Sequence, residues 1–167
     1  MKKFARTGIF LLIITATLIL TIMQRAYNSR YSNWGINNLR PNSWSESEQL
    51  FLAPQNLQIS FSTAKQQEIS VYILDRKALE EWHQTKALTP IIAIENASNR
   101  IAIYEVPKRD AYSILIYNPN KTPVSVEINL TLQGFEKDLL IATTVIALTG
   151  IILIIFQRFF KNREYST

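Results

Sequence analysis

The side chains that could do acid–base or metal chemistry are few and scattered along the chain. The sequence has one histidine, His83, and no cysteine. A metal site would therefore need His83 together with carboxylates, and neither a thiolate catalyst nor a disulfide can form. Glu80 and Glu81 are adjacent, so on a helix they point about 100° apart and cannot share a proton. We interpret His83 as a structural or surface residue late in a short helix, rather than a ligand or a catalyst.

Nucleophilic and phosphate-binding motifs are also missing from the sequence. There is no G-x-S-x-G pattern and no glycine-rich loop, and the chain holds only four glycines. The sequence therefore predicts that the protein is not an enzyme and holds no metal or other cofactor. A hydrolase whose site follows none of these patterns stays the alternative.

Three N-x-[ST] sequons mark candidate glycosylation positions at Asn96, Asn120 and Asn129. The first two fall in predicted turns, where an acceptor must be reachable. Asn129 falls on the polar side of a predicted strand. We expect them to be used only if the central segment is exported in a glycosylating organism.

Two uncharged apolar runs, residues 7–24 and 139–157, dominate the ends of the chain. As helices they would be about 27–29 Å long, close to the thickness of a bilayer's hydrocarbon core. We predict two transmembrane helices, the first of them a signal anchor. A cleavable signal peptide is the alternative for the first run, but the run is long for one and no A-x-A-like site follows it.

The charge distribution predicts the topology. The net charge is +5, yet residues 25–138 contain twelve basic and twelve acidic residues, so the excess lies on the tails, residues 1–6 and 158–167. The positive-inside rule places both tails in the cytoplasm and the central domain outside, at the plasma membrane or an internal membrane. A neutral central domain is not what a nucleic-acid-binding protein needs.

The central segment reads as a linker followed by a domain. Residues 25–48 are polar, and we expect a juxtamembrane linker there. If the first helix continues, Tyr27, Tyr31 and Trp34 share one face as an aromatic belt; otherwise they pack on the domain. From residue 49 to 134 apolar residues alternate with polar ones, which is typical of half-buried strands. Residues 75–84 predict a short helix with Asp75 as its N-cap and with Leu79 and Trp82 facing the sheets.

These elements predict a mainly β fold: an extracytoplasmic antiparallel β-sandwich, jelly-roll or Ig-like, with one short helix and a transmembrane helix at each end. The turn Asn118-Pro119-Asn120-Lys121 joins two strongly alternating segments, residues 112–116 and 124–132. We expect these two segments to form an antiparallel hairpin.

The order of elements resembles a known family. A hairpin-like pair, NLQISFSTA and QQEISVYILD, precedes a helix ending in EEWHQ, and the pair AYSILIYNPNKTPVSVEINLTLQG closes the domain. Over residues 50–134 this is similar to the GOLD (Golgi-dynamics) domains and to GOLD-like sandwiches of archaeal and bacterial membrane proteins. The resemblance implies a fold, and a function only by analogy. Unlike the eukaryotic cargo receptors of that family, this chain has no disulfide and no room for a coiled coil before its second span.

The predicted function is a membrane-anchored recognition or assembly module. The predicted partners are membrane lipid and another membrane or secreted protein, with a glycan as a third candidate. We do not expect it to bind nucleic acid. The candidate contacts are Trp34, Trp44, Asn118 and Pro119. The alternative is an accessory subunit of a membrane enzyme or transporter, bound through small faces of its helices. Those faces contain Thr17 and Thr21 in the first helix and Thr143, Ala147 and Gly150 in the second.

Overall fold

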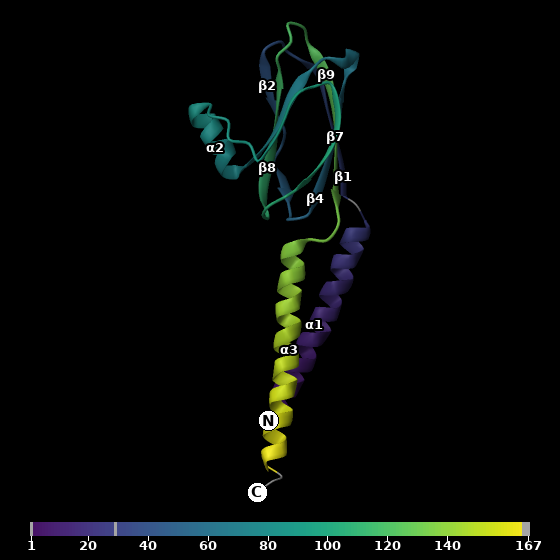
Figure 1. The fold of residues 1–167 in the computed structure, drawn as a ribbon, viewed down its shortest axis with the longest axis vertical. Coiled ribbons are helices and arrows are strands. Elements are labelled where there is room, and N and C mark those ends of the chain that lie inside the picture. Colours follow the sequence, from purple (N-terminus) through teal and green to yellow (C-terminus); the bar gives the residue numbers. More distant parts are fainter. Residues whose placement is uncertain (1, 29, 165–167) are drawn as a thin grey trace. The chain divides into compact units, whose positions relative to one another are not determined.

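The computed structural model describes residues 2–28 and 30–164, and it divides into two compact units (Figure 1). One unit is a helix pair made by residues 1–28 and 135–167, and the other is a β-sandwich made by residues 29–134. Residue 1 and residues 165–167, at the ends of the two predicted tails, lie outside the described part of the chain.

The helix pair consists of α1 (Lys2–Tyr27) and α3 (Lys137–Glu164), which pack antiparallel to each other. Both helices are long and apolar enough to cross a membrane, over Phe4–Tyr27 and Lys137–Phe159. At one end of the pair the Arg25 guanidinium lies 2.8 Å from the Glu136 carboxylate, which is buried. At the other end the Ala5 amide donates to the side-chain oxygen of Gln157.

The sandwich has two antiparallel sheets. The first sheet has the order β1-β9-β4-β7, and the second has the order β2-β8-β5-β6 with β3 also paired to β8. Strands that follow one another in the chain mostly lie in opposite sheets, which is the jelly-roll arrangement. The bounds are β1 (Arg30–Leu39), β2 (Ser43–Glu46), β3 (Leu50–Leu52), β4 (Asn56–Thr63), β5 (Ile69–Asp75), β6 (Ile92–Ala97), β7 (Asn99–Glu105), β8 (Asp110–Asn118) and β9 (Val124–Gln133), with a 3-10 turn, η1 (Ala64–Gln66), after β4.

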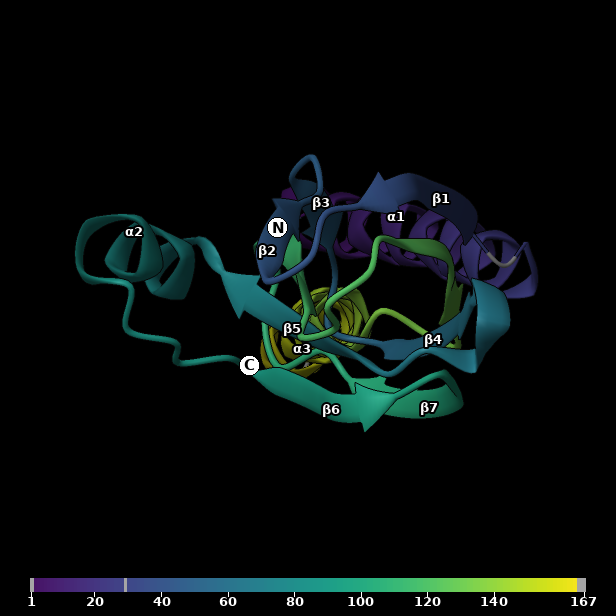
Figure 2. The same ribbon diagram turned by 90° about the horizontal axis from the view of Figure 1, so that it is seen from above.

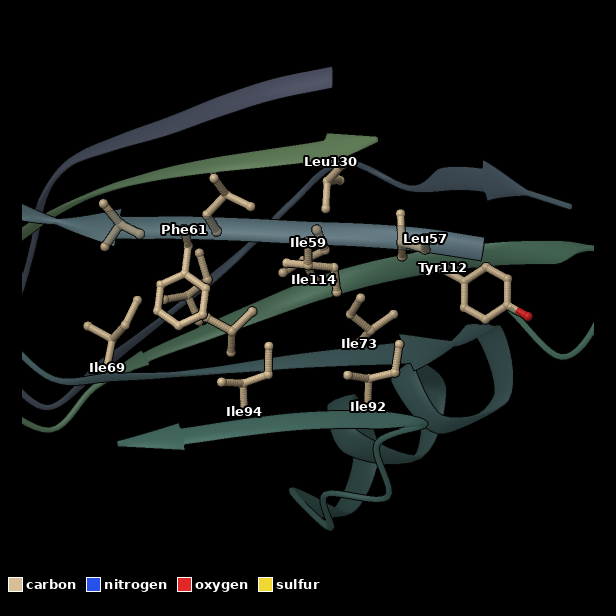
Figure 3. Close-up of a cluster of buried hydrophobic side chains, with 14 of the residues drawn as sticks. Leu57, Ile59, Phe61, Ile69, Ile73, Ile92, Ile94, Tyr112, Ile114 and Leu130 are labelled. Carbon is tan, nitrogen blue, oxygen red and sulfur yellow. The ribbon is translucent and has the colours of Figure 1, made fainter. Parts of the chain in front are cut away.

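The core lies between the two sheets and is built by the predicted alternation. From β4, the side chains of Leu57, Ile59 and Phe61 point towards those of Ile73 and Ile114 on the second sheet (Figure 3). All five of these side chains are buried. Side chains alternate between the two faces of a strand, so the neighbours of each inward apolar residue face outwards. The period-two pattern therefore gives each sheet one apolar face, and the two apolar faces pack against each other.

The region predicted as a linker instead forms β1 and β2. Trp34, Ile36 and Leu39 face inwards and pack against the core, and β1 pairs with β9 from Arg30↔Leu132 to Leu39↔Val124. The polar residues between them occupy the outward positions. The segment has low strand propensity, but pairing with a central strand overrides it.

The aromatic belt is also wrong, because α1 ends at Tyr27. Tyr27 is 90% exposed, and Tyr31 and Trp34 belong to β1. Trp34 packs against the core of the sandwich, so for this residue the second interpretation, packing on the domain, is the one that the structure has.

The predicted hairpin does not form. β8 and β9 lie in different sheets, and so do β4 and β5, the first hairpin-like pair. β9 has β1 and β4 as its neighbours, while β8 lies between β2 and β5. A short polar turn joins antiparallel strands equally well across the two layers, and non-local partners decide which arrangement forms.

The short helix, α2 (Arg76–Thr85), forms as predicted. Asp75 caps it by accepting a hydrogen bond of 2.9 Å from the Ala78 amide. Leu79 is buried against Leu74 and Leu115, so α2 covers the outer face of the second sheet (Figure 2). Lys86, in the left-handed region at φ 62°, ends the helix.

Asp75 should stabilise the sandwich both as a cap and as an ion. The Ala78 amide and then the Lys108 ammonium, 2.9 Å away, lower the pKa of Asp75. Its contribution as an ion is therefore present above its unfolded pKa and is lost as the pH falls through the folded pKa. We expect Asp75→Ala to lower the free energy of unfolding by about 1 kcal/mol at neutral pH. Denaturant unfolding followed by tryptophan fluorescence measures this.

Asp75→Asn is the matched control, because asparagine also caps helices well but carries no charge. Its small deficit relative to wild type should shrink as the pH falls through the folded pKa of Asp75, because the aspartate then becomes protonated as well. An Asp75→Ala variant as stable as wild type at neutral pH would contradict the assigned cap.

Candidate functional site

Four aromatic rings gather on the outer side of the second sheet, and we call Trp44, Tyr72, Trp82 and Tyr117 the aromatic surface. Trp44 is at its centre, with ring centroids 4.7 Å from Tyr117, 5.7 Å from Tyr72 and 5.8 Å from Trp82. These separations lie in the range of favourable aromatic pairs. Trp44 remains 39% exposed.

Different elements supply the rings. Trp44 on β2 is the direct cross-strand partner of Tyr117 on β8, which places both side chains on one face. Tyr72 comes from β5, the next strand of the sheet, and α2 brings Trp82 over the same face. Burial is the largest cause of the raised pKa of Tyr72, whose hydroxyl donates to the Glu95 carboxylate at 3.1 Å.

Charged groups surround the exposed part of this surface. His83 Nε2 lies 2.9 Å from Glu46 Oε2, and the Lys86 ammonium is 4.3 Å from the centre of the Trp82 ring. His83 and Lys86 are exposed. An apolar aromatic centre with a polar rim is the make-up of protein–protein interfaces, where Trp and Tyr are enriched. Across the described residues, 2–28 and 30–164, no cluster of three or more His, Asp or Glu side chains could hold a metal ion.

The other predicted contacts lie apart from the aromatic surface. Trp34 lines a cavity of about 320 Å³ between β1 and β3. Asn118 is 0% exposed, and its amide donates to the carbonyls of Leu39, Arg40 and Thr122 at 2.9–3.1 Å. Asn118 therefore stabilises the connection from β8 to β9, and its buried side chain is not placed to touch a partner. Pro119, in contrast, is exposed.

The three sequon asparagines lie in different environments. Asn96 is exposed where β6 turns into β7, with φ at 52°. The Asn120 side-chain nitrogen donates to the Glu68 carbonyl at 2.7 Å and to the Asn118 side-chain oxygen at 2.9 Å, so a glycan, which replaces one of its two hydrogens, would remove one of these bonds. Asn129 lies on β9, in the middle of the first sheet.

Of the two predicted small-residue faces, the one on α3 lies in the contact between the helices and the one on α1 does not. Thr143 and Gly150 are buried and Ala147 is partly buried in the helix pair. Thr17 and Thr21 are exposed, and their hydroxyls donate to carbonyls of their own helix at 3.1 and 2.9 Å.

Gly150 instead meets Gly8, which the sequence analysis missed. A Cβ at Gly8 would lie 2.7 Å from the Gly150 carbonyl oxygen, and a Cβ at Gly150 would lie 3.0 Å from the Gly8 carbonyl oxygen. The two backbones therefore approach more closely than side chains would allow. The sequence does contain a signal for this contact, because each apolar run has a single glycine.

Solved structures of other proteins match this chain only weakly. No family model matches the chain, and no curated protein matches it. A xylan-binding module from Roseburia intestinalis matches at a TM-score of 0.40 and 11% identity, over 67% of this chain and 87% of that module. The lysozyme inhibitor PliG of Aeromonas hydrophila matches at 0.37 and 11%, over 61% and 85%. The pre-peptidase C-terminal domain of a Bacillus anthracis collagenase matches at 0.37 and 11%, over 56% and 92%.

The approach of Gly8 and Gly150 yields a test of the helix pair. With cysteines at Ala5 and Gln157, which are in contact, a short bis-maleimide should cross-link the two helices in a chain that has no other cysteine. We expect Gly150→Ile to reduce this cross-link at least several-fold, because the new side chain would collide with α1.

The matched control is Thr149→Ile, which adds a side chain of the same kind at the neighbouring, exposed position. It should leave the cross-link unchanged. Equal cross-linking in the Gly150→Ile variant would contradict the close approach of the two glycines.

Proposed function

We propose that this protein is a membrane-tethered recognition module, which presents the aromatic surface to another membrane protein or to a secreted protein. The observation that carries the proposal is Trp44, 39% exposed at the centre of three further aromatic rings. Tryptophan is among the residue types enriched in interface hot spots, and an indole 39% exposed within a cluster of aromatic rings is available to a partner.

The proposed anchor has two parts. α1 is a retained signal anchor, and α3 is a second span that returns the chain to the same side of the membrane. The basic residues beyond each apolar run and the neutral balance of residues 25–138 support cytoplasmic tails and an extracytoplasmic sandwich. The GOLD-like resemblance stays a prediction within this proposal.

The perturbed acids and bases have structural partners in the sandwich. Lys108 bridges Asp75 at 2.9 Å and Asp110 at 3.0 Å, which raises the pKa of Lys108 and contributes to the lowered pKa values of both carboxyls. Such ion-pair networks shift pKa values without catalysis. The shifted pKa values of these three groups therefore have a structural cause.

A second candidate function is an accessory subunit held through its helices. Thr17 and Thr21 favour it, because they leave a small polar stripe of α1 exposed in the helix pair. In that case the partner would pack on α1 within the membrane, and the aromatic surface would be dispensable.

Photo-cross-linking in native membranes separates the two functions. A photoreactive residue at Glu46, on the rim of the aromatic surface, captures the partner, which mass spectrometry identifies. Trp44→Ala should then reduce recovery of that partner at least tenfold, as expected for a hot spot worth about 1.4 kcal/mol or more.

Phe51→Ala is the matched control, since Phe51 is also an exposed aromatic residue on an edge strand paired with β8. It should leave recovery unchanged. If Trp44→Ala retains the partner while replacement of the residues 7–24 span by polyleucine abolishes capture, the accessory-subunit function replaces the one proposed.

A further inference from the structure

The outward positions of β1, β9 and β4 in the first sheet are mostly neutral and polar, whereas those of β7 include the exposed Ile101 and Ile103. Cross-strand partners there form rows of amides and hydroxyls, such as Asn33–Asn129–Ser60 and Thr131–Gln58. Of the side chains that the structure describes at the outward positions of β1, β9 and β4, none is Lys or Arg, and Glu127 is the charged one. We call this the amide face.

That composition opposes what an exposed sheet normally selects. Asn and Gly are depleted in strands, and Glu and Lys, which are usual at exposed positions, are depleted to a lesser degree. The outward positions of these strands therefore contain several poor strand formers where charged side chains are usual. A requirement for short, neutral hydrogen-bonding groups at these positions explains the choice.

The amide face is hollowed where β1 bends. The register of β1 against β9 shifts between Ile36 and Leu39, and Asn38 adopts φ 59°. Gly35 lies in the floor, where an added Cβ would meet its nearest atom, the Val126 carbonyl oxygen, only at 3.9 Å. The hollow has a volume of about 750 Å³, and Asn33, Asn37, Ser62 and Glu127 are among the residues that line it.

The polar groups in this hollow are only loosely engaged with one another. The Asn33 side-chain amide donates to the Glu127 carboxylate at 3.3 Å, and the Asn38 backbone N–H donates to the Ser125 hydroxyl at 3.4 Å. Both distances are at the long end for a hydrogen bond. Groups held this way can exchange their partners for those of a ligand at little cost.

We propose that this hollow binds a neutral polyhydroxylated ligand, a short segment of glycan. Amide and hydroxyl side chains both donate and accept, which matches the hydroxyl groups of a sugar. Glu127 is the charged residue in the lining, so a phosphate or sulfate group would meet repulsion from it, and no Lys or Arg is among the described residues that line the hollow. The volume lies in the range of ligand-binding clefts.

The hollow and its proposed ligand are separate from the aromatic surface. The hollow lies on the outer side of the first sheet, whereas Trp44 lies on the outer side of the second sheet. Trp44→Ala should therefore leave glycan binding intact, so failure of either proposal is separate from failure of the other.

Affinity electrophoresis of the full chain tests the site. The protein is purified in a polyoxyethylene detergent, since glycosidic detergents would compete, and is run in native gels containing galactomannan, β-glucan or xylan. At least one of these neutral polysaccharides should retard it, while polygalacturonate should not. N-glycans released from a glycoprotein, added as competitors, distinguish a protein-borne source of the ligand from a polysaccharide.

Gly35→Val is the sharpest variant, because valine fills the floor of the hollow while favouring the strand. We expect it to weaken the apparent affinity for the retarding polysaccharide at least tenfold without lowering the melting temperature. Ala93→Val, on an outward position of β6 in the second sheet, is the matched control and should bind as wild type.

Ser62→Glu, which adds a second carboxylate to the lining, tests the same site if Gly35→Val fails to fold, and it should also abolish retardation. The proposal is overturned if none of the three neutral polysaccharides retards the wild-type chain, or if a folded Gly35→Val or Ser62→Glu variant binds as well as wild type.

Discussion

The pairing of β1 with β9 is the constraint on which the rest of the molecule depends. β1 begins three residues after α1 ends, and β9 ends four residues before α3 begins. Their antiparallel register, with Arg30 opposite Leu132, therefore brings both chain connections to neighbouring positions at one end of one sheet. Two apolar helices leaving adjacent strands can pair with each other, as Gly8 and Gly150 do. The same ladder supplies the bent edge that hollows the amide face.

The two outer faces of the sandwich differ in chemistry because they are covered differently. On the second sheet, α2 buries Leu74 and Leu115, and the aromatic rings extend that apolar layer to the surface. Nothing in the described chain covers the first sheet in this way, and the outward positions of β1, β9 and β4 are mostly neutral and polar. One inward core thus supports two distinct exposed surfaces, one apolar and aromatic, the other polar with Glu127 as its charged residue.

Local pattern predicted most elements of this fold, but not their partners. The alternation in Leu57, Ile59 and Phe61 and the cap at Asp75 depend on neighbours in the sequence, so both were predictable. β1 was missed because its outward asparagines hide a weak inward pattern. The split of β8 and β9 between the sheets, the burial of Asn118 and the meeting of Trp44 with Tyr117 all depend on non-local pairing, which periodicity does not encode.

We propose that both helices span a membrane and that the sandwich lies on the opposite side from both tails. The chain has no native cysteine, so single-cysteine variants at Arg6, Lys121 and Arg158 can each be labelled with a membrane-impermeant maleimide in intact cells, or in sealed vesicles should the protein lie in an internal membrane. We expect Lys121→Cys to react from the side opposite the cytoplasm. We expect Arg6→Cys and Arg158→Cys to react only from the cytoplasmic side. Labelling of the sandwich and of either tail from the same side would contradict it.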